Sequence, residues 1–503
     1  MYNINSKNME TKKYTILIMF ILLTKITFGQ AFNLDIVNGY GAGTYLEGDT
    51  IHVWSKAVFN DTVFVNWTGS GANYLANNNE WHTTLIVPSN TSVGNLTINA
   101  NYDTIFPIPQ VGSTSFLLYG LNQGVETNVL KETYYAIPHN PKGIVFFIHG
   151  TNGNGQHFFS GYNRTNVIKD FVYADFAVFT LDANEVTMGD QDGDGTHRWD
   201  CTDAYFAGTS NNIDLKNMQA LKDSIINTFN FPATIPCFSL GVSNGANFSD
   251  ICASALGFKA SAHITATGRT GTYLRNDLAP VIWIMSDNDH NQHADNDAAH
   301  SNYQTMINSL VHAEYHTLFR SPVYSERFLR NSNNMNISQA NSVFQRLLDL
   351  GLLDSDYYLT VMDVTNDIPI STFDNLGLTN PQKSEVKQQL LIVNADHLVH
   401  SDFNKNIIRF FNQELILSVN EPVQNKMAVR LFPNPVNDEL NIEIEDTYQF
   451  LEVSVYSIIG KKVLSYKNET RISLGNLLSG VYFVKIKKDG MLKTFKIIKI
   501  ASR

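Results

Sequence analysis

Residues 235–256 read IPCFSLGVSNGANFSDICASAL. The apolar run at 235–240 predicts a strand buried on both faces, because a strand covered by helices on both sides has no polar face. The run at 246–256 is compatible with a helix. Between them stands Gly241-Val242-Ser243-Asn244-Gly245, and a G-x-S-x-G turn is so tight that only small residues fit beside the serine. This stretch therefore predicts a strand, a sharp turn and a helix, with Ser243 held clear of the sheet.

The surrounding sequence, residues 111–415, alternates strands with helices. Leu215, Met218, Leu221 and Ile225 recur at spacings of three and four, which predicts an amphipathic helix. Strands that alternate with helices predict an α/β fold, with a mostly parallel sheet covered on both faces. Further buried strands are expected at residues 144–148, 176–181, 262–266 and 281–285.

A second motif, His149-Gly150-Thr151-Asn152-Gly153, follows the expected strand 144–148. Together the two motifs resemble the α/β-hydrolases, in which the G-x-S-x-G turn is the nucleophile elbow. In that family a loop after the third strand and the residue after the nucleophile each give a backbone N–H to the oxyanion hole. The resemblance implies Ser243 as the nucleophile and Thr151 and Asn244 as the oxyanion-hole residues.

The acid of a hydrolase triad is expected after a later strand, and the histidine after the acid. Beyond the expected strand 281–285 the chain reads Ser286-Asp287-Asn288-Asp289-His290. Asp289 is the preferred acid, because hydrolases of this kind place it a few residues beyond the apolar run. Asp287 is the alternative acid.

The histidine is expected on a loop near the end of this region. Residues 389–393, with the apolar run 390–393, predict the last strand, which ends in Asn394-Ala395-Asp396-His397. A histidine between the last strand and the last helix can reach back to the serine, so His397 is the expected base and His400 is the alternative. Asp396 either orients this loop or is solvated.

These roles describe acyl transfer to water. A serine hydroxyl is a weak nucleophile, so His397 removes its proton during attack and the Asp289 carboxylate stabilises the imidazolium. The two backbone N–H groups stabilise the tetrahedral oxyanion. This chemistry requires no cofactor.

Three segments narrow the resemblance: HGTNGNG, GVSNGANFS and SDNDHN, at residues 149–155, 241–249 and 286–291. They resemble secreted carboxylesterases related to feruloyl esterases, acetyl xylan esterases and poly(3-hydroxyalkanoate) depolymerases. The resemblance is good over residues 143–256 and poor beyond about 300. It implies a serine ester hydrolase acting on esters of plant polysaccharides or on polyesters. A helical insert at about 303–385, in which Val343, Leu347 and Leu350 suggest a helix, is expected to form a lid or a pocket wall.

Two other classes of protein use or keep such a fold. A serine peptidase of the prolyl-oligopeptidase type uses the same triad, but it usually has another glycine where this chain has Ala246. It also carries a large propeller, for which 503 residues leave no room. A non-catalytic adhesion protein would keep the fold and lose a triad residue.

Metal sites are weakly indicated. The segment 190–195, with Asp190, Asp192 and Asp194, resembles the start of an EF-hand calcium loop, but its twelfth position is Cys201 where a glutamate is needed. The alternatives are a structural Ca²⁺ and a solvated loop. A second group has no zinc-ligand spacing and predicts no metal: His290, His293 and His300 with Asp287, Asp295 and Asp297.

The two ends of the chain predict export. Residues 1–29 have a lysine-rich start, a short apolar run and a small residue before Gln30, the pattern of a secretory signal peptide. Residues 416–428 have no periodicity and read as a linker. Residues 429–503 contain PNP, VSVYSIIGKKV and LGNLLSGVYFVKI, which resemble the C-terminal sorting domain of type IX secretion substrates in Bacteroidetes. The resemblance implies a small β-sandwich, handled by that secretion machinery and then cleaved or attached to the cell surface.

Residues 30–110 predict a second all-β domain, with strands expected at 50–54, 62–67, 83–87 and 96–100. Its glycine-rich hairpin at 39–43, its Phe64 with Trp67, and its closing Asn101-Tyr102 resemble a bacterial repeat domain of secreted proteins. Trp54 and Trp67 alternate with polar neighbours, which favours core positions over sugar binding. The domain reads as a spacer or a substrate-proximity module.

The charge of the chain is uneven. Its net charge is −11, but residues 30–429 hold 20 Lys+Arg against 38 Asp+Glu, a net charge of −18. So acidic a body gives no reason to expect a nucleic-acid partner. It would also repel polyanionic substrates, which favours neutral esters.

Overall fold

The computed structural model describes residues 30–88, 91, 93–201, 212–269, 271–274, 278–291, 294–419, 429–444, 450–457, 461–488 and 491–500. The expected signal peptide and most of the expected linker lie outside these residues. The chain divides into two compact units, Met1–Leu415 and Ile416–Arg503. Within the described residues, every helix is too short or too polar to cross a bilayer.

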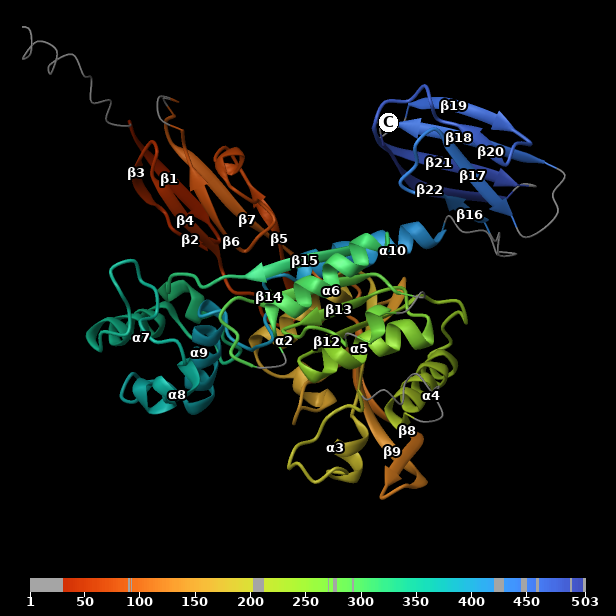
Figure 1. Cartoon of the computed structure of the whole chain (residues 1–503). Helices are drawn as coiled ribbons and strands as arrows, with labels where there is room; N and C mark the ends of the chain where they lie inside the picture. Colours follow the sequence, from red (N-terminus) through yellow and green to blue (C-terminus); the bar gives the residue numbers. More distant parts are fainter. Residues whose placement is uncertain are drawn as a thin grey trace, which may run out of the picture. The chain divides into compact units, whose positions relative to one another are not determined.

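The first unit is built on an eight-stranded sheet with the spatial order β15-β14-β13-β12-β10-β11-β9-β8 (Figure 1). The strands from β10 to β15 are parallel, while β9 and β8 are antiparallel additions at one edge. The bounds are β8 Gln110–Asn122, β9 Val125–Ile137, β10 Gly143–Ile148, β11 Phe176–Leu181, β12 Cys237–Val242, β13 Ser261–Ile264, β14 Val281–Ser286 and β15 Ala313–Leu318.

Strand β10 lies between β11 and β12, so the order of strand addition reverses there. In open α/β sheets, ligands bind outside the carboxyl ends of the strands at such a switch point. The topology therefore places the candidate site where β10 and β12 end, and these ends lead directly into the two sequence motifs.

Helices cover both faces of the sheet: α2 Tyr162–Tyr173, α3 Asn184–Met188, α4 Ile213–Thr228, α5 Asn244–Leu256, α6 Asn296–Asn308 and α10 Asn404–Val419. On one face, Phe147 packs in a cluster with Phe171 of α2 and Phe410 of α10. On the other, Phe146 packs in a cluster with α4 and α5. Because both faces are covered, every residue of β10, β11, β12 and β14 is buried, as their apolar runs predict.

The predicted strand at 389–393 is wrong, because these residues end the helix α9, Asn380–Val393. Thr379 and Gln382 form a capping box at its start, and such a box stabilises a helix start. The helical continuation buries Val386, Leu390 and Val393 on one face. A short apolar run fits a strand and a buried helix equally well. Here the capping box at Thr379 favours the helix.

The helical insert also begins later than expected, because α6 and β15 belong to the main fold. It has its own apolar core, and Leu350 caps the C-terminus of α7 as an exposed residue. Its elements are η6 Ser325–Leu329, α7 Ile337–Asp349, α8 Val364–Asp367, η7 Ile370–Phe373 and α9.

The N-terminal strands of the first unit form two sheets, β3-β1-β7-β5 and β2-β4-β6, around one core. Phe64 and Trp67 are buried in this core, as predicted for Trp67. Trp54 is also buried, but the predicted core position is wrong for it, because its ring stacks on His82 and packs against Tyr324 outside the sandwich. The strands are β1 Ala31–Val37, β2 Gly39–Tyr40, β3 Gly43–Leu46, β4 Thr50–Ser55, β5 Thr62–Thr68, β6 His82–Ile86 and β7 Leu96–Thr104.

The second unit is a β-sandwich with the sheets β16-β17-β20 and β19-β18-β21-β22. The expected linker is four residues too long at its start, because α10 continues to Val419 and no helix-breaking residue precedes Pro422. The strands are β16 Val429–Phe432, β17 Glu439–Ile444, β18 Leu451–Ser457, β19 Lys462–Lys467, β20 Arg471–Ser473, β21 Gly480–Lys488 and β22 Met491–Lys499.

Candidate active site

Ser243 stands at the sharp turn between β12 and α5. Its backbone has φ 54° and ψ −126°, a strained conformation for a residue with a side chain. Its N–H donates to Ile264 O at 2.9 Å, which ties the turn to β13. A Cβ on Gly241 would overlap the carbonyl group of Gly245, and a Cβ on Gly245 would overlap the carbonyl oxygens that end β10. Both glycines are therefore required by backbone contacts around the serine.

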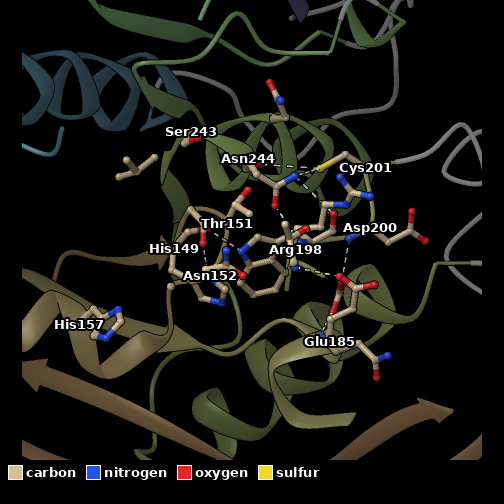
Figure 2. Close-up of a pocket in the computed structure, with 18 of the residues that line it drawn as sticks. His149, Thr151, Asn152, His157, Glu185, Arg198, Asp200, Cys201, Ser243 and Asn244 are labelled. Carbon is tan, nitrogen blue, oxygen red and sulfur yellow. Dashed lines mark hydrogen bonds between the residues drawn. The ribbon is translucent and has the colours of Figure 1, made fainter. Parts of the chain in front are cut away.

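The loop after β10 packs directly against this turn. A Cβ on Gly150 would lie 3.2 Å from the Cβ atom of Ser243, so the backbone of this loop approaches the serine closely. Gly153 N donates to Gly150 O at 3.0 Å and closes a turn that carries Thr151. Asn152 has a positive φ of 57° and exchanges two hydrogen bonds with His197. Thr151 and Asn152 thus lie on a braced turn at the site (Figure 2).

Asn244 is the first residue of α5, where a backbone N–H has no acceptor within the helix and lies at the positive end of the helix dipole. Its side chain holds a neighbouring segment, because Trp199 N donates to Asn244 Oδ1 at 2.8 Å. Both candidate oxyanion residues therefore line the same cavity as Ser243.

Trp199 braces the loop from behind and was not anticipated from the sequence. Its indole Nε1–H donates to His149 O at 2.8 Å, and its ring stacks on Phe248 with centroids 4.6 Å apart. The ring of His149 is buried, and burial lowers its pKa to about 4. Its Nε2 accepts from Ala183 N at 3.1 Å, so the proton of the neutral ring is on Nδ1, which donates to Gly150 O at 2.8 Å.

The acid and the base come together as the preferred assignments expect. His397 Nδ1 lies 2.6 Å from Asp289 Oδ2, and the side chain of Asp289 has no exposed surface. The second carboxylate oxygen of Asp289 accepts from Asn291 N at 2.9 Å. Asp396 orients the loop, because its Oδ1 accepts from His397 N at 2.8 Å. With Nδ1–H donated to Asp289, the Nε2 of a neutral His397 is left as the acceptor.

The alternative residues lie elsewhere. Asp287 is exposed, and its backbone N–H bonds to Leu318 O at the end of β15. His400 is buried, and among the described residues neither of its ring nitrogens has a hydrogen-bond partner. Burial lowers the pKa of His400 to about 4. Neither residue lines the cavity that contains Ser243.

The cavity has a volume of about 1250 Å³. It is lined by Ser243, Thr151, Asn244 and His397. Figure 2 labels Ser243 and Asn244 at the turn, and Thr151 on the loop after β10. The cavity wall also contains charged side chains of both signs: Arg164, Glu185, Asp192, Arg198, Asp214 and Arg269. Burial raises the pKa of Asp214 to about 6.

The acidic loop forms one edge of this cavity. Glu185, Asp190 and Asp192 offer oxygens within 4.8 Å of one another. These acids already have donors: Asp190 accepts backbone N–H groups of its own loop, and Arg198 bonds to Asp192 at 2.6 Å and to Asp194 at 2.5 Å. Arg198 therefore offsets one of the negative charges of this loop, and the set departs from an EF-hand.

The other residues considered for metal binding have separate roles. Asp295 caps α6 by accepting from Ala298 N, His300 contacts Tyr303 and Tyr315, and His293 lies outside the described residues. Among the described residues, the group at the acidic loop is the one cluster with metal-ligand spacing. Cys237 and Cys252 are buried apolar-core residues beside the elbow.

The sheet and the elbow after its fifth strand define an α/β-hydrolase fold. Solved structures are similar over 42% of this chain: a dienelactone hydrolase from Anabaena variabilis (17% identity, 87% of that chain, TM-score 0.30), a cold-adapted esterase from an Arctic intertidal metagenomic library (16%, 86%, 0.30) and a lipase in its open form (10%, 90%, 0.31). At these identities and TM-scores, no substrate or activity of this chain follows from the similarity. A search of curated proteins found no match in sequence.

Residues 430–500 match the secretion system C-terminal sorting domain. This match covers the sandwich of the second unit, and it agrees with the resemblance drawn from the PNP and LGNLLSGVYFVKI motifs. The domain supports secretion or attachment at the cell surface, and it implies an interaction with the type IX secretion machinery.

Proposed function

We propose that this chain is a secreted serine carboxylic-ester hydrolase that uses Ser243, His397 and Asp289. The observation that carries the proposal is the 2.6 Å bond between His397 and Asp289, formed by a histidine that lines the same cavity as the elbow serine. If Ser243 had only a structural role, the strained backbone, the two required glycines and the buried acid–histidine pair at one cavity would have no explanation.

In the proposed mechanism His397 Nε2 accepts the hydroxyl proton while Ser243 Oγ attacks the ester carbonyl carbon. The carbonyl π electrons move to oxygen, and the backbone N–H groups of Thr151 and Asn244 stabilise that oxyanion, each typically worth about 3 kcal/mol. The imidazolium, stabilised by Asp289, then gives its proton to the leaving alcohol as the C–O bond breaks. Water, deprotonated by His397, attacks the acyl-enzyme, and the serine leaves with the proton.

The substrate we propose is a neutral ester of a plant polysaccharide or a polyester. The cavity of about 1250 Å³ exceeds the roughly 300–1,000 Å³ of ordinary small-molecule sites, which supports a substrate larger than a simple acetate. The net charge of −18 over residues 30–429 disfavours polyanionic chains. Export, which the sorting domain supports and the expected N-terminal signal peptide would begin, favours a substrate outside the cell.

Hydrolysis of p-nitrophenyl acetate and of a peptide anilide by wild type, Ser243→Ala and Ser301→Ala tests this proposal. Ser301 is an exposed helix residue and serves as the matched control. We expect ester turnover by wild type and Ser301→Ala only. Turnover of the anilide alone would favour the serine peptidase, and no Ser243-dependent turnover of either substrate would favour a non-catalytic adhesion protein. Feruloylated, acetylated and polyester substrates then separate the acyl groups.

A further inference from the structure

The loop that carries His397 is held at its far end by a buried ion cluster. This loop runs from α9 to α10, and five residues after His397 it presents Asp402. The carboxylate of Asp402 lies 2.9 Å from Nη1 of Arg327 and 3.5 Å from Nη2 of Arg330. Arg327 is in η6 of the insert, and Arg330 is the residue that caps its C-terminus. It also accepts the indole Nε1–H of Trp81 at 3.2 Å, from the N-terminal sandwich.

Each arm of this cluster is itself fixed. The guanidinium of Arg330 lies 4.0 Å from the centre of the Trp81 ring, a cation–π contact, and bonds to the hydroxyl of Ser401. Ser401 in turn donates to Asn163 Oδ1 of α2 at 3.1 Å. Four elements thus meet at Ser401 and Asp402: the sandwich, the insert, α2 and the histidine loop.

The sandwich holds the next residues of the chain as well. Lys405 Nζ, in the first turn of α10, donates to Val65 O at 2.8 Å and to Asn79 O. Tyr162 of α2 accepts from Val58 N at 3.1 Å. These contacts of the sandwich therefore fall on the segment directly after His397 and on the helix beside it.

We propose, on the basis of the proposed function, that Trp81 and Asp402 are positioning residues for His397. Asp289 holds one ring nitrogen and leaves the backbone of the loop to be fixed by other contacts. Asn288 N holds this loop before His397 through Ala395 O, and the Trp81–Asp402–Arg327 cluster fixes it after His397, so the N-terminal sandwich is part of the catalytic unit and not a spacer. Because misplacing a catalytic group by about 1 Å can cost on the order of 10²-fold in rate, this support affects turnover.

The variant Trp81→Phe tests the proposal, because it removes the N–H donor to Asp402 and keeps a ring beside Arg330. The matched control is Tyr324→Phe. Tyr324 OH bonds to His52 Nε2 at 3.0 Å, so this variant also removes one hydrogen bond between the insert and the sandwich, but it leaves the side-chain donors to Asp402 in place. Thermal unfolding of both variants measures the purely structural loss.

We expect Trp81→Phe to lower kcat about tenfold with KM nearly unchanged, and to slow fluorophosphonate labelling of Ser243 by a similar factor. We expect Tyr324→Phe to lower the unfolding temperature comparably and to leave kcat within about twofold. Equal effects of the two variants on kcat would overturn the proposal.

A second readout separates this proposal from the proposed function. In ¹⁵N-histidine-labelled protein, the proton between His397 and Asp289 is expected far downfield in wild type and Tyr324→Phe, and shifted or broadened in Trp81→Phe. This signal needs no turnover. If the wild-type protein hydrolyses no ester, the proposed function fails, but this signal still tests whether Trp81 positions His397. An unchanged signal in Trp81→Phe would contradict the positioning role.

Discussion

Nδ1 of His397 lies 2.6 Å from Oδ2 of Asp289, although 108 positions separate the two residues in the chain. The acid follows β14 and the histidine follows α9. Asn288 N donates to Ala395 O at 3.1 Å, so a backbone hydrogen bond also joins the two loops beside the pair.

Asp289→Asn is expected to reduce kcat about 10³- to 10⁴-fold, because the amide no longer holds the Nδ1–H tautomer or stabilises the imidazolium. The matched control is Asp287→Asn, two residues away and exposed, which should leave kcat near the wild-type value. Steady-state hydrolysis of p-nitrophenyl acetate gives both numbers. A larger loss in Asp287→Asn than in Asp289→Asn would reverse the assignment of the acid.

Gly245→Ala is expected to destabilise the first unit by more than about 3 kcal/mol, because the added methyl group overlaps the carbonyl oxygens of Ile148 and His149. Gly94→Ala is the control, since a Cβ there has no neighbour within 4 Å. Soluble yield and thermal unfolding compare the two. A stable Gly245→Ala protein would show that the elbow tolerates a side chain.

Trp199→Phe should keep the stack on Phe248 and lose the hydrogen bond to His149 O. We expect a stability loss of about 1 kcal/mol and a fall in kcat of about tenfold, because the loop that carries Thr151 is no longer braced. Trp283→Phe is the control: its indole donates to Thr267 O at 3.2 Å and does not line the cavity. Equal kcat values for the two variants would show that Trp199 does not support catalysis through this loop.

The buried His400 is expected to make the first unit sensitive to acid. Burial lowers its folded-state pKa from 6.5 to about 4, so between these values the unfolded chain binds a proton that the native protein excludes. Stability therefore falls as the pH decreases from 6.5 to 4, by up to about 3 kcal/mol. In His400→Phe this part of the loss should disappear, as measured by urea unfolding at several pH values.

The same variant tests His400 as an alternative base. Loss of a general base costs about 10²- to 10⁴-fold in rate, so His400→Phe should keep kcat within about tenfold of wild type, while His397→Phe should not. A larger fall in kcat for His400→Phe than for His397→Phe would assign the role of base to His400.

Calcium is expected to have little effect, because Arg198 already pairs with Asp192 and Asp194 and backbone N–H groups of the loop already bond to Asp190. A Ca²⁺ site would add about 2.7 kcal/mol to the free energy of unfolding at a free Ca²⁺ concentration of 100 times its Kd. Thermal unfolding with millimolar Ca²⁺ and with EDTA should therefore agree. A clear rise with Ca²⁺ that is lost in Asp190→Ala would establish a calcium site at this loop.

The sequence alone determined the parts that local chemistry controls. A buried apolar run, a G-x-S-x-G turn and a helix-compatible run specify the elbow, because each is a property of neighbouring residues. The same holds for the C-terminal sorting domain, whose motifs are contiguous. The error at residues 389–393 shows the limit of local patterns, since a short apolar run suits a strand or a buried helix.

The tertiary structure decided which distant residues meet. His397 contacts Asp289, whereas Asp287 is exposed and His400 is buried elsewhere, because only the fold determines which side chain is buried against which partner. It also revealed Trp199 behind the oxyanion loop and Trp81 at Asp402, 321 positions away in the chain. No periodicity encodes such contacts, since packing between separate elements arises only when the whole chain has folded.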